Sequence, residues 1–366
     1  MESDYLPISK NFATLSIHSG NTGEDSEYAC VVPPIVSSVN FRLNFSLTED
    51  SISQKYTYSK IANPTRNNLE QCLATLEGAK YGLCFSSGGG GLSSLLAMLK
   101  PGSHIICNNS IFGGTVVLLN NIANSFSFTT SYVDMHNLEN LVNAIQPNTA
   151  LIWTESISNP LMKVADIKNI SRVAKERNVL LAVDNTFLTP YFHRPLELGA
   201  DIVNYSLTKY FNGHCDIIMG SLLVNKKELY DKLSFIQCAM GIVPSSFDCA
   251  EMIKSLKTFA LRMKQHSINA IKVASQTSGH SGMVSFYING DLKQTKQLLN
   301  NFKLIIPTTS FGAIESIAEI PLLISQSPVP SKQRDPKVTN NLVRLSVGLE
   351  NDEDIINDLD QALNSL

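Results

Sequence analysis

A single lysine, Lys209, stands among small hydroxyl residues in the segment NYSLTKY at residues 204–210. The segment begins in an apolar run typical of a β-strand, so Lys209 is expected just past a strand's end. An amine there can form a Schiff base with a carbonyl compound, and Ser206 and Thr208 can hydrogen-bond an anionic group beside it. A surface lysine after a strand is the common alternative, so the prediction depends on the rest of the chain.

A run of four glycines, Gly88 to Gly91, follows Ser87 between a predicted strand and a predicted helix. Exposed backbone N–H groups at a helix start can bind a phosphate. The run lacks the Gly-Lys-Ser/Thr of a P-loop, and Ser93 stands where a dinucleotide fingerprint needs glycine or alanine. A flexible strand-to-helix turn is the alternative interpretation.

Two charged residues lie in apolar runs. Asp184 ends the run VLLAV at residues 179–183, where an ionised carboxylate needs a cationic partner such as a protonated ring nitrogen. Arg344 lies in LVRLSV at residues 342–347, and a guanidinium suits a substrate carboxylate. The alternatives are a turn or helix-capping aspartate and a solvent-exposed strand arginine.

Short apolar runs recur along the chain, with helix-like segments between several of them. This rhythm predicts crossover units and a mostly parallel sheet, in which ligands gather at the carboxyl ends of the strands. Polar clusters follow four of the predicted strands, at residues 86–89, 155–159, 184–186 and 206–209. The predicted strands of this sheet are residues 81–85, 104–107, 128–133, 150–153, 179–183, 202–205 and 217–224.

The flanking regions have different patterns. Residues 1–57 show little periodicity and are interpreted as an arm that packs on the body of the protein or on a partner subunit. A long helical stretch, residues 249–274, is expected to lead into a second, smaller domain with strands at 283–288 and 342–347. A final helix is expected to be capped at Asp352.

Composition narrows the class of function. With 366 residues, 43% of them hydrophobic, the chain is long enough for two or three cores. A net charge of -3 provides no basic excess for nucleic acid. Seven scattered cysteines without a C-x-x-C pair favour a reducing compartment, and neither a signal peptide nor an apolar membrane run is expected. These features together predict a cytoplasmic location. The histidines form no pair at metal-ligand spacing, so no metal is predicted.

Together these residues predict a pyridoxal-phosphate enzyme that acts on an amino acid. The glycine run would bind the phosphate, Asp184 the ring nitrogen, Lys209 the aldehyde and Arg344 the substrate's carboxylate. The chain resembles the Cys/Met-metabolism family of pyridoxal-phosphate enzymes from about residue 12 to residue 363. The motifs that carry the resemblance include VVPPI at 31–35, NPTRN at 63–67, VDNTF at 183–187, SLTKY at 206–210 and RLSVGLE at 344–350.

The resemblance implies an α/β fold of the fold-type I class, with a mostly parallel large domain and a smaller, shortened α/β C-terminal domain. The implied division is an arm at residues 1–57 that contacts a neighbouring subunit, a large cofactor-binding domain at 58–258 and a small domain at 259–366. It also implies a homotetramer, a dimer of dimers with active sites shared between subunits, that binds an amino-acid substrate but neither nucleic acid nor membrane.

Carried over residue by residue, the resemblance assigns roles around the cofactor. Lys209 would bind the cofactor's aldehyde carbon and shuttle protons, and Asp184 would keep the pyridine nitrogen protonated. The phosphate would be bound by Gly88, Gly89, Ser206 and Thr208, joined from a neighbouring subunit by Tyr58 and Lys60.

The remaining roles concern the ring face and the substrate. Phe112 would stack on the ring, and Asn159 would meet the ring's phenolic oxygen and contribute to substrate binding. Arg344, with Ser310 nearby, would take the substrate's α-carboxylate. The implied reaction is α,γ-elimination from cystathionine to give cysteine, 2-oxobutanoate and ammonia.

Four departures from the family pattern bear on activity. Phe112 replaces the usual tyrosine, which loses a hydroxyl worth roughly a hundredfold in proton transfer. Lys60 replaces an arginine, Thr309 stands where an acidic residue is expected, and the small domain is shortened between residues 266 and 281. The alternatives are therefore cystathionine γ-synthesis, methionine γ-elimination (disfavoured by Gly114, where a cysteine is common), or a diverged, weakly active or inactive paralogue that acts as a subunit partner.

Overall fold

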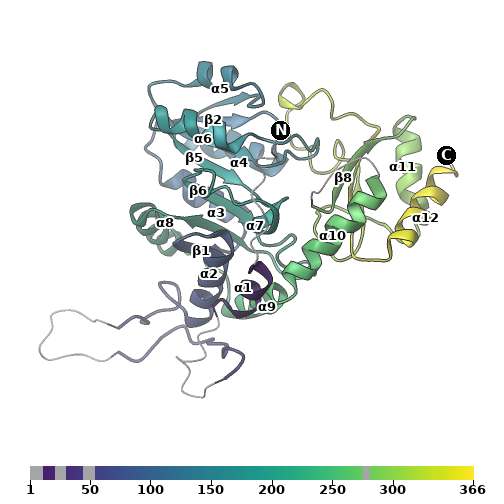
Figure 1. The fold of residues 1–366 in the computed structure, drawn as a ribbon. Helices are drawn as coiled ribbons and strands as arrows, with labels where there is room; N and C mark the ends of the chain where they lie inside the picture. The colour runs from purple at the N-terminus through teal and green to yellow at the C-terminus, as the bar shows by residue number, and fades with distance from the viewer. Residues whose placement is uncertain (1–10, 21–29, 44–53, 275–280) are drawn as a thin grey trace, which may run out of the picture.

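The computed structural model describes residues 11–20, 30–43, 54–274 and 281–366, which form two α/β domains (Figure 1). Parts of the predicted arm, residues 1–10, 21–29 and 44–53, lie outside the described residues. Within the arm, α1 (Phe12–His18) is a short helix that the sequence pattern did not predict. The ring of Phe12 is 1% exposed and packs against Tyr191 and Phe259, so this part of the arm contacts the body of its own chain.

The large domain is built on a seven-stranded sheet with the order β1-β7-β6-β5-β4-β2-β3. The strands from β6 to β3 in this order pair in parallel, while β7 is antiparallel to both β1 and β6. The mostly parallel sheet is therefore confirmed. Its strands are β1 (Tyr81–Phe85), β2 (His104–Asn108), β3 (Thr129–Val133), β4 (Thr149–Glu155), β5 (Leu180–Asp184), β6 (Ile202–Ser206) and β7 (Gly220–Val224).

Helices cover both faces of this sheet. Successive residues of a strand point to opposite faces and therefore contribute to two different hydrophobic clusters. Leu151 and Trp153 belong to one hydrophobic cluster, whereas Ile152 between them belongs to the other. The first cluster is completed by α3 (Gly88–Ala97), α4 (Gly113–Ser125) and α8 (Lys227–Met240). The second is completed by α2 (Pro64–Glu77), α5 (Leu138–Ala144), α6 (Ile167–Glu176), α7 (Thr189–Phe192) and α9 (Ser246–Leu256).

Local signals set several helix ends as expected. The side chain of Asp166 accepts a hydrogen bond from the N–H of Asn169 and caps α6, and Gly78 ends α2 with a left-handed φ of 76°. The single helix expected over residues 249–274 is wrong, because the chain breaks at residues 257–258 into α9 and α10 (Phe259–Ala274). The break allows α10 to place Met263 in the large-domain core and Ala270 in the small-domain core.

The small domain has a four-stranded sheet with the order β8-β11-β10-β9. Two of its strands lie close to the predicted residues 283–288 and 342–347, whereas its helix at residues 292–301 was not predicted. The cap of the last helix is Asn351, whose side chain accepts from the N–H of Glu353, and not Asp352. The elements are β8 (Met283–Tyr287), α11 (Leu292–Asn301), β9 (Ile306–Pro307), β10 (Ile317–Glu319), the short η2 (Ser331–Gln333), β11 (Leu342–Ser346) and α12 (Asp352–Leu363).

Membrane-spanning helices and metal-ligand clusters are both absent from residues 11–20, 30–43, 54–274 and 281–366. No helix there is long and apolar enough to cross a membrane. In the same residues no group of three or more His, Cys, Asp or Glu side chains could hold a metal ion.

Candidate active site

A cavity of about 360 Å³ lies at the carboxyl ends of β1, β4, β5 and β6, and its size suits a small-molecule ligand. Phe311 of the small domain closes part of the wall. All four polar clusters predicted to meet at this edge contribute lining residues, namely Ser87, Gly88, Gly89, Glu155, Asn159, Asp184, Thr186, Ser206, Thr208 and Lys209.

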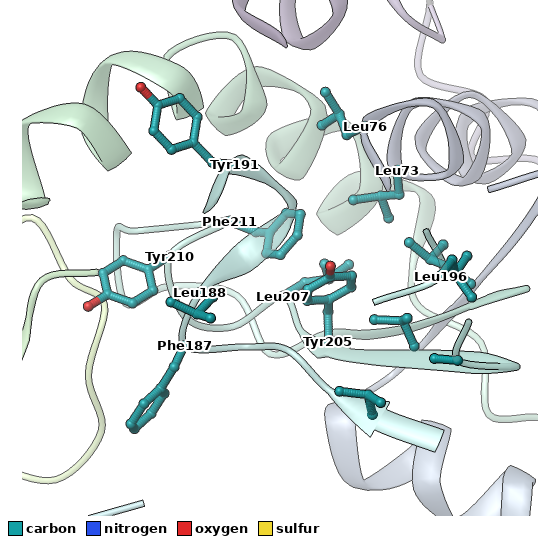
Figure 2. Close-up of a cluster of buried hydrophobic side chains, with 14 of the residues drawn as sticks. Leu73, Leu76, Phe187, Leu188, Tyr191, Leu196, Tyr205, Leu207, Tyr210 and Phe211 are labelled. Atoms are coloured by element: carbon teal, nitrogen blue, oxygen red, sulfur yellow. The ribbon is translucent and has the colours of Figure 1, made fainter. Parts of the chain in front are cut away.

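The lysine segment is held by side chains that point away from the cavity. Leu207, Tyr210 and Phe211 are at most 1% exposed and pack into the core (Figure 2). The hydroxyl of Thr208 accepts from the N–H of Met219 at 3.0 Å, which ties the segment to the start of β7. This anchoring restricts the backbone on both sides of Lys209, so the amine has a defined position.

Lys209 Nζ donates to Ser310 Oγ at 2.5 Å and lies 5.0 Å from the centre of the Phe311 ring. Burial lowers the pKa of Lys209 to about 8, and the nearby charge of Arg344 acts in the same direction. A lowered pKa leaves more of the amine neutral at physiological pH, which is the reactive form toward a carbonyl group. The sequence prediction that centres the site on Lys209 fits this environment.

The glycine run starts a helix and does not form a separate turn. Ser87 caps α3 by accepting from the N–H of Gly90 at 2.9 Å, and the helix begins at Gly88. A Cβ added to Gly88 would lie 3.1 Å from the Cβ of Ser206, so the glycine allows β6 and the helix start to meet. Gly88, Gly89, Ser206 and Thr208 all line the cavity, and a helix start beside hydroxyl residues is an arrangement suited to phosphate.

Asp184 ends β5 on the cavity wall, with intermediate exposure. Its Oδ1 accepts from the N–H of Thr186 at 3.0 Å, and its Oδ2 accepts from Asn204 Nδ2 at 2.8 Å. Within the described ranges no basic side chain forms a salt bridge with it, and burial raises the pKa of Asp184. A cationic ligand group beside this carboxylate would favour its ionised form.

Arg344 is 2% exposed, so the solvent-exposed alternative is wrong. Its Nη1 donates to Asn159 Oδ1 at 2.8 Å, and its Nη2 donates to the carbonyl of Ser310 at 2.7 Å. The buried Glu319 carboxylate lies 3.2 Å from Nη2. Arg344 and Ser310 do not line the cavity themselves, but they contact Asn159 and Lys209, which do.

Sequence reasoning did not assign roles to two acidic residues of this region. Glu319 stands in the apolar run IAEI at residues 317–320, the same kind of signal that identified Asp184. Glu155 ends β4 within a polar cluster noted in the sequence, and it pairs in register with Asp184 on the next strand. Burial and the neighbouring Asp184 raise the pKa of Glu155 well above its usual value.

Of the remaining predicted residues, Phe112 lines the cavity, whereas Tyr58 and Lys60 lie outside it. Phe112 is 48% exposed, so part of its side chain is accessible to a ligand. Tyr58 and Lys60 do not line the cavity of their own subunit. They belong to a turn that Arg66 holds through the backbone carbonyls of Ser59 and Ile61, both at 2.9 Å.

The fold and the cavity define a class: an α/β protein with a buried lysine at the carboxyl edge of a mostly parallel sheet, in a cavity that also holds a helix start suited to phosphate and the carboxyl group of Asp184. The family model described as Cys/Met metabolism PLP-dependent enzyme matches residues 13–276 and 273–364. The chain belongs to this family, and its cofactor is pyridoxal phosphate.

Comparisons with individual proteins cover nearly the whole chain. The sequence is 39% identical to human cystathionine gamma-lyase over 388 residues, with 98% of this chain and 95% of that protein covered. The structure is similar to the yeast cystathionine gamma-lyase (36% identity, TM-score 0.90, 98% and 99% covered). It is also similar to the cystathionine gamma synthase of Xanthomonas oryzae pv. oryzae (30% identity, TM-score 0.90, 96% and 97% covered).

The comparisons also bear on the predicted shortening of the small domain. The two family matches meet at residues 273–276, inside the segment 266–281 where a shortening is predicted. The human relative aligns over 388 positions, more than the 366 residues of this chain, so it has residues without a counterpart here. Residues 275–280 themselves lie outside the described residues.

The residues of the cavity fit the cofactor. A lysine whose pKa is lowered suits the aldehyde, hydroxyls and helix N–H groups suit the phosphate, and Asp184, which forms no salt bridge within the described residues, suits a protonated pyridine nitrogen. Transsulfuration chemistry on an amino acid is the class of reaction that the family defines.

Proposed function

We propose that this chain cleaves L-cystathionine by α,γ-elimination, with water, to L-cysteine, 2-oxobutanoate and ammonia. The observation that carries the proposal is the group formed by Lys209, Ser310, Arg344 and Asn159, in which one hydrogen-bonded chain joins a reactive amine to a carboxylate-binding guanidinium. The relatives named cystathionine gamma-lyase support the choice of substrate.

The side chains divide the work in this proposal. Pyridoxal phosphate, when bound, supplies the electron sink that makes protons next to the substrate's amine acidic. Lys209 moves the proton at the α carbon, and its lowered pKa allows it to accept and return that proton near neutral pH. Arg344 and Asn159 orient the substrate's carboxylate, and Asp184 holds the proton on the ring nitrogen.

One assay tests the proposal directly. The purified protein is supplied with pyridoxal phosphate and treated with borohydride, and the modified peptide is identified by mass spectrometry. A second sample without borohydride is assayed for 2-oxobutanoate release from cystathionine. The expected results are modification at Lys209 and cystathionine-dependent release. A modified but inactive protein would contradict the lyase proposal and favour the paralogue, and absence of modification would contradict the assignment of Lys209.

Cystathionine gamma-synthase activity is the second candidate, because a synthase has the same TM-score to this chain as the yeast lyase. The same preparation distinguishes the two activities. It is given cysteine and a homoserine ester, whose carboxylate leaves the γ carbon as the sulfur of cysteine bonds to it. Formation of cystathionine from this pair that is faster than cystathionine cleavage would favour synthesis.

Replacing Phe112 by tyrosine is expected to raise kcat about 10- to 100-fold, since a hydroxyl on this cavity-lining ring restores a proton-transfer group. The measurement is steady-state cystathionine cleavage by both proteins. Phe126→Tyr is the matched control, because Phe126 is also partly exposed but does not line the cavity. An unchanged kcat in Phe112→Tyr would show that the missing hydroxyl does not limit the rate.

We infer that active sites are shared between subunits, with Tyr58 and Lys60 reaching the phosphate of a neighbour. Tyr58 is 41% exposed, and the turn that carries both residues is fixed to its own subunit through Arg66. Both side chains lie outside their own cavity, which supports a role in another subunit. The proposed assembly is a homotetramer formed by two such dimers.

Subunit mixing tests this arrangement. Lys60→Ala is expected to weaken cofactor binding about tenfold by removing a charged contact. Subunits with Lys209→Ala and subunits with Lys60→Ala are co-expressed with different tags and purified as hybrids. Each hybrid dimer keeps one intact site, so we expect it to recover about a quarter to a half of wild-type activity at limiting cofactor. Activity no greater than that of the separate variants, or a monomer in sedimentation, would contradict shared sites.

A further inference from the structure

Glu155 joins two loops at the rim of the cavity. Its Oε1 accepts from the N–H of Phe112 at 2.7 Å, and its Oε2 accepts from the N–H of Asn159 at 3.1 Å. The residue is 7% exposed. One carboxylate therefore fixes the backbone of the residue proposed to stack on the cofactor and of the residue that contacts Arg344.

Gln326 of the small domain holds the same two loops from the other side. Its Nε2 donates to the carbonyl of Ile111 at 3.0 Å and to the carbonyl of Asn159 at 3.2 Å, and the residue is 5% exposed. The carbonyl of Ile111 and the N–H of Phe112 belong to a single peptide group. That peptide is thus held at its oxygen by Gln326 and at its nitrogen by Glu155.

The segment that carries Gln326 also leads to Arg344. The hydroxyl of Ser325 donates to Glu319 Oε1, the same oxygen that lies 3.2 Å from Arg344 Nη2. A Cβ on Gly113 would lie 2.2 Å from the carbonyl oxygen of Ser325, so only glycine lets this segment approach the start of α4 so closely. Arg344 is therefore connected to the loop of Phe112 by consecutive contacts through Glu319 and Ser325.

We propose that Gln326 is a positioning residue, which together with Glu155 clamps the Ile111–Phe112 peptide and Asn159 and so sets Phe112 over the cofactor. The proposal rests on the proposed site. Gln326 lies outside the cavity wall and acts through the two loops. Losing its amide leaves two carbonyls without this donor in a buried setting, and the loops shift to regain partners. A shift of about 1 Å at such a site lowers the rate about a hundredfold.

Gln326→Met tests the proposal, because methionine keeps the length of the side chain and removes the donor. Gln333→Met is the matched control in the same domain, where the side chain accepts from Asn120 Nδ2 at an exposed position. We expect Gln326→Met to change the visible circular dichroism of the bound cofactor and to lower kcat/KM about 10- to 100-fold, while Gln333→Met stays within about twofold. Should Gln326→Met not fold, Gln326→His, which retains one N–H donor, is measured in the same way and is expected to show a smaller change.

A double-mutant cycle with Glu155→Gln separates a clamp from general destabilisation. Because both residues hold one peptide group, the double variant is expected to lose clearly less than the product of the two single losses in kcat/KM. Unchanged circular dichroism in the Gln326 variant with kcat/KM equal to that of Gln333→Met would overturn the proposal, as would independent effects in the cycle. Circular dichroism does not require turnover, so it tests the clamp even if the cystathionine activity is absent.

Discussion

Replacing Lys209 by alanine is expected to lower kcat for cystathionine cleavage by about 10⁴-fold, because the change removes both the amine that binds the cofactor and the base proposed to move the α proton. Lys209 is the one basic side chain that lines the cavity within the described residues. The measurement is steady-state turnover of the purified variant with added pyridoxal phosphate. Borohydride is expected to attach no cofactor to this variant.

Lys227→Ala is the control for the loss of a lysine, since Lys227 is exposed on α8 and pairs with Asp231. Its kcat is expected to stay within about twofold of wild type. A Lys209→Ala protein that kept a tenth of wild-type kcat would contradict the central role of this residue.

The pH dependence of cofactor capture gives a separate test of the same side chain. With the pKa lowered to about 8, the neutral amine gains population as pH rises toward that value. Capture of pyridoxal phosphate by the apoprotein is therefore expected to accelerate about tenfold per pH unit below 8 and to level off above it. A rate that kept rising to pH 10 would indicate an amine with the ordinary pKa of lysine.

Asp184→Asn is expected to lower kcat about 10²- to 10³-fold, because the neutral amide cannot stabilise a proton on the cofactor's ring nitrogen. The side chain keeps nearly the same shape, and one oxygen remains to accept from Thr186 or Asn204. KM for cystathionine is expected to change little, since Arg344 and Asn159, which are proposed to bind the substrate's carboxylate, are unchanged. Steady-state kinetics with saturating cofactor separate the two effects.

Asp201→Asn is the matched control at the opposite end of the same sheet. Asp201 accepts from the N–H of Leu181 at 3.0 Å and pairs with Lys226, so its replacement also removes a charge with its hydrogen bonds. This variant is expected to lose some stability and to keep its kcat. Equal losses of kcat in both variants would mean that the effect of Asp184→Asn comes from structure and not from the charge at the ring nitrogen.

Local patterns in the sequence were sufficient for much of the large domain. The run at residues 179–183 predicted β5 to within a residue, and Gly78 marked the end of α2. Such features depend on neighbours a few positions away, through side-chain alternation and the left-handed backbone that glycine tolerates. The break between α9 and α10 was missed because residues 257–258 carry neither glycine nor proline, and the turn follows from packing α10 against two domains.

The sequence by itself determined which chemical groups are present: an amine between hydroxyls, a carboxylate after an apolar run, a glycine-rich helix start and a strand arginine. The strand pattern also predicted that the first three gather at one edge of the sheet. Only the tertiary structure decided which side chains touch and that Arg344 joins them. Lys209 reaches Ser310 across 101 positions, Arg344 reaches Asn159 across 185, and Gln326 reaches Ile111 across 215. These contacts depend on the order of strands and on the packing of one domain against the other, which no local pattern encodes. Burial in that assembly also lowers the pKa of Lys209 to about 8, an effect that the residues next to it in the sequence do not indicate.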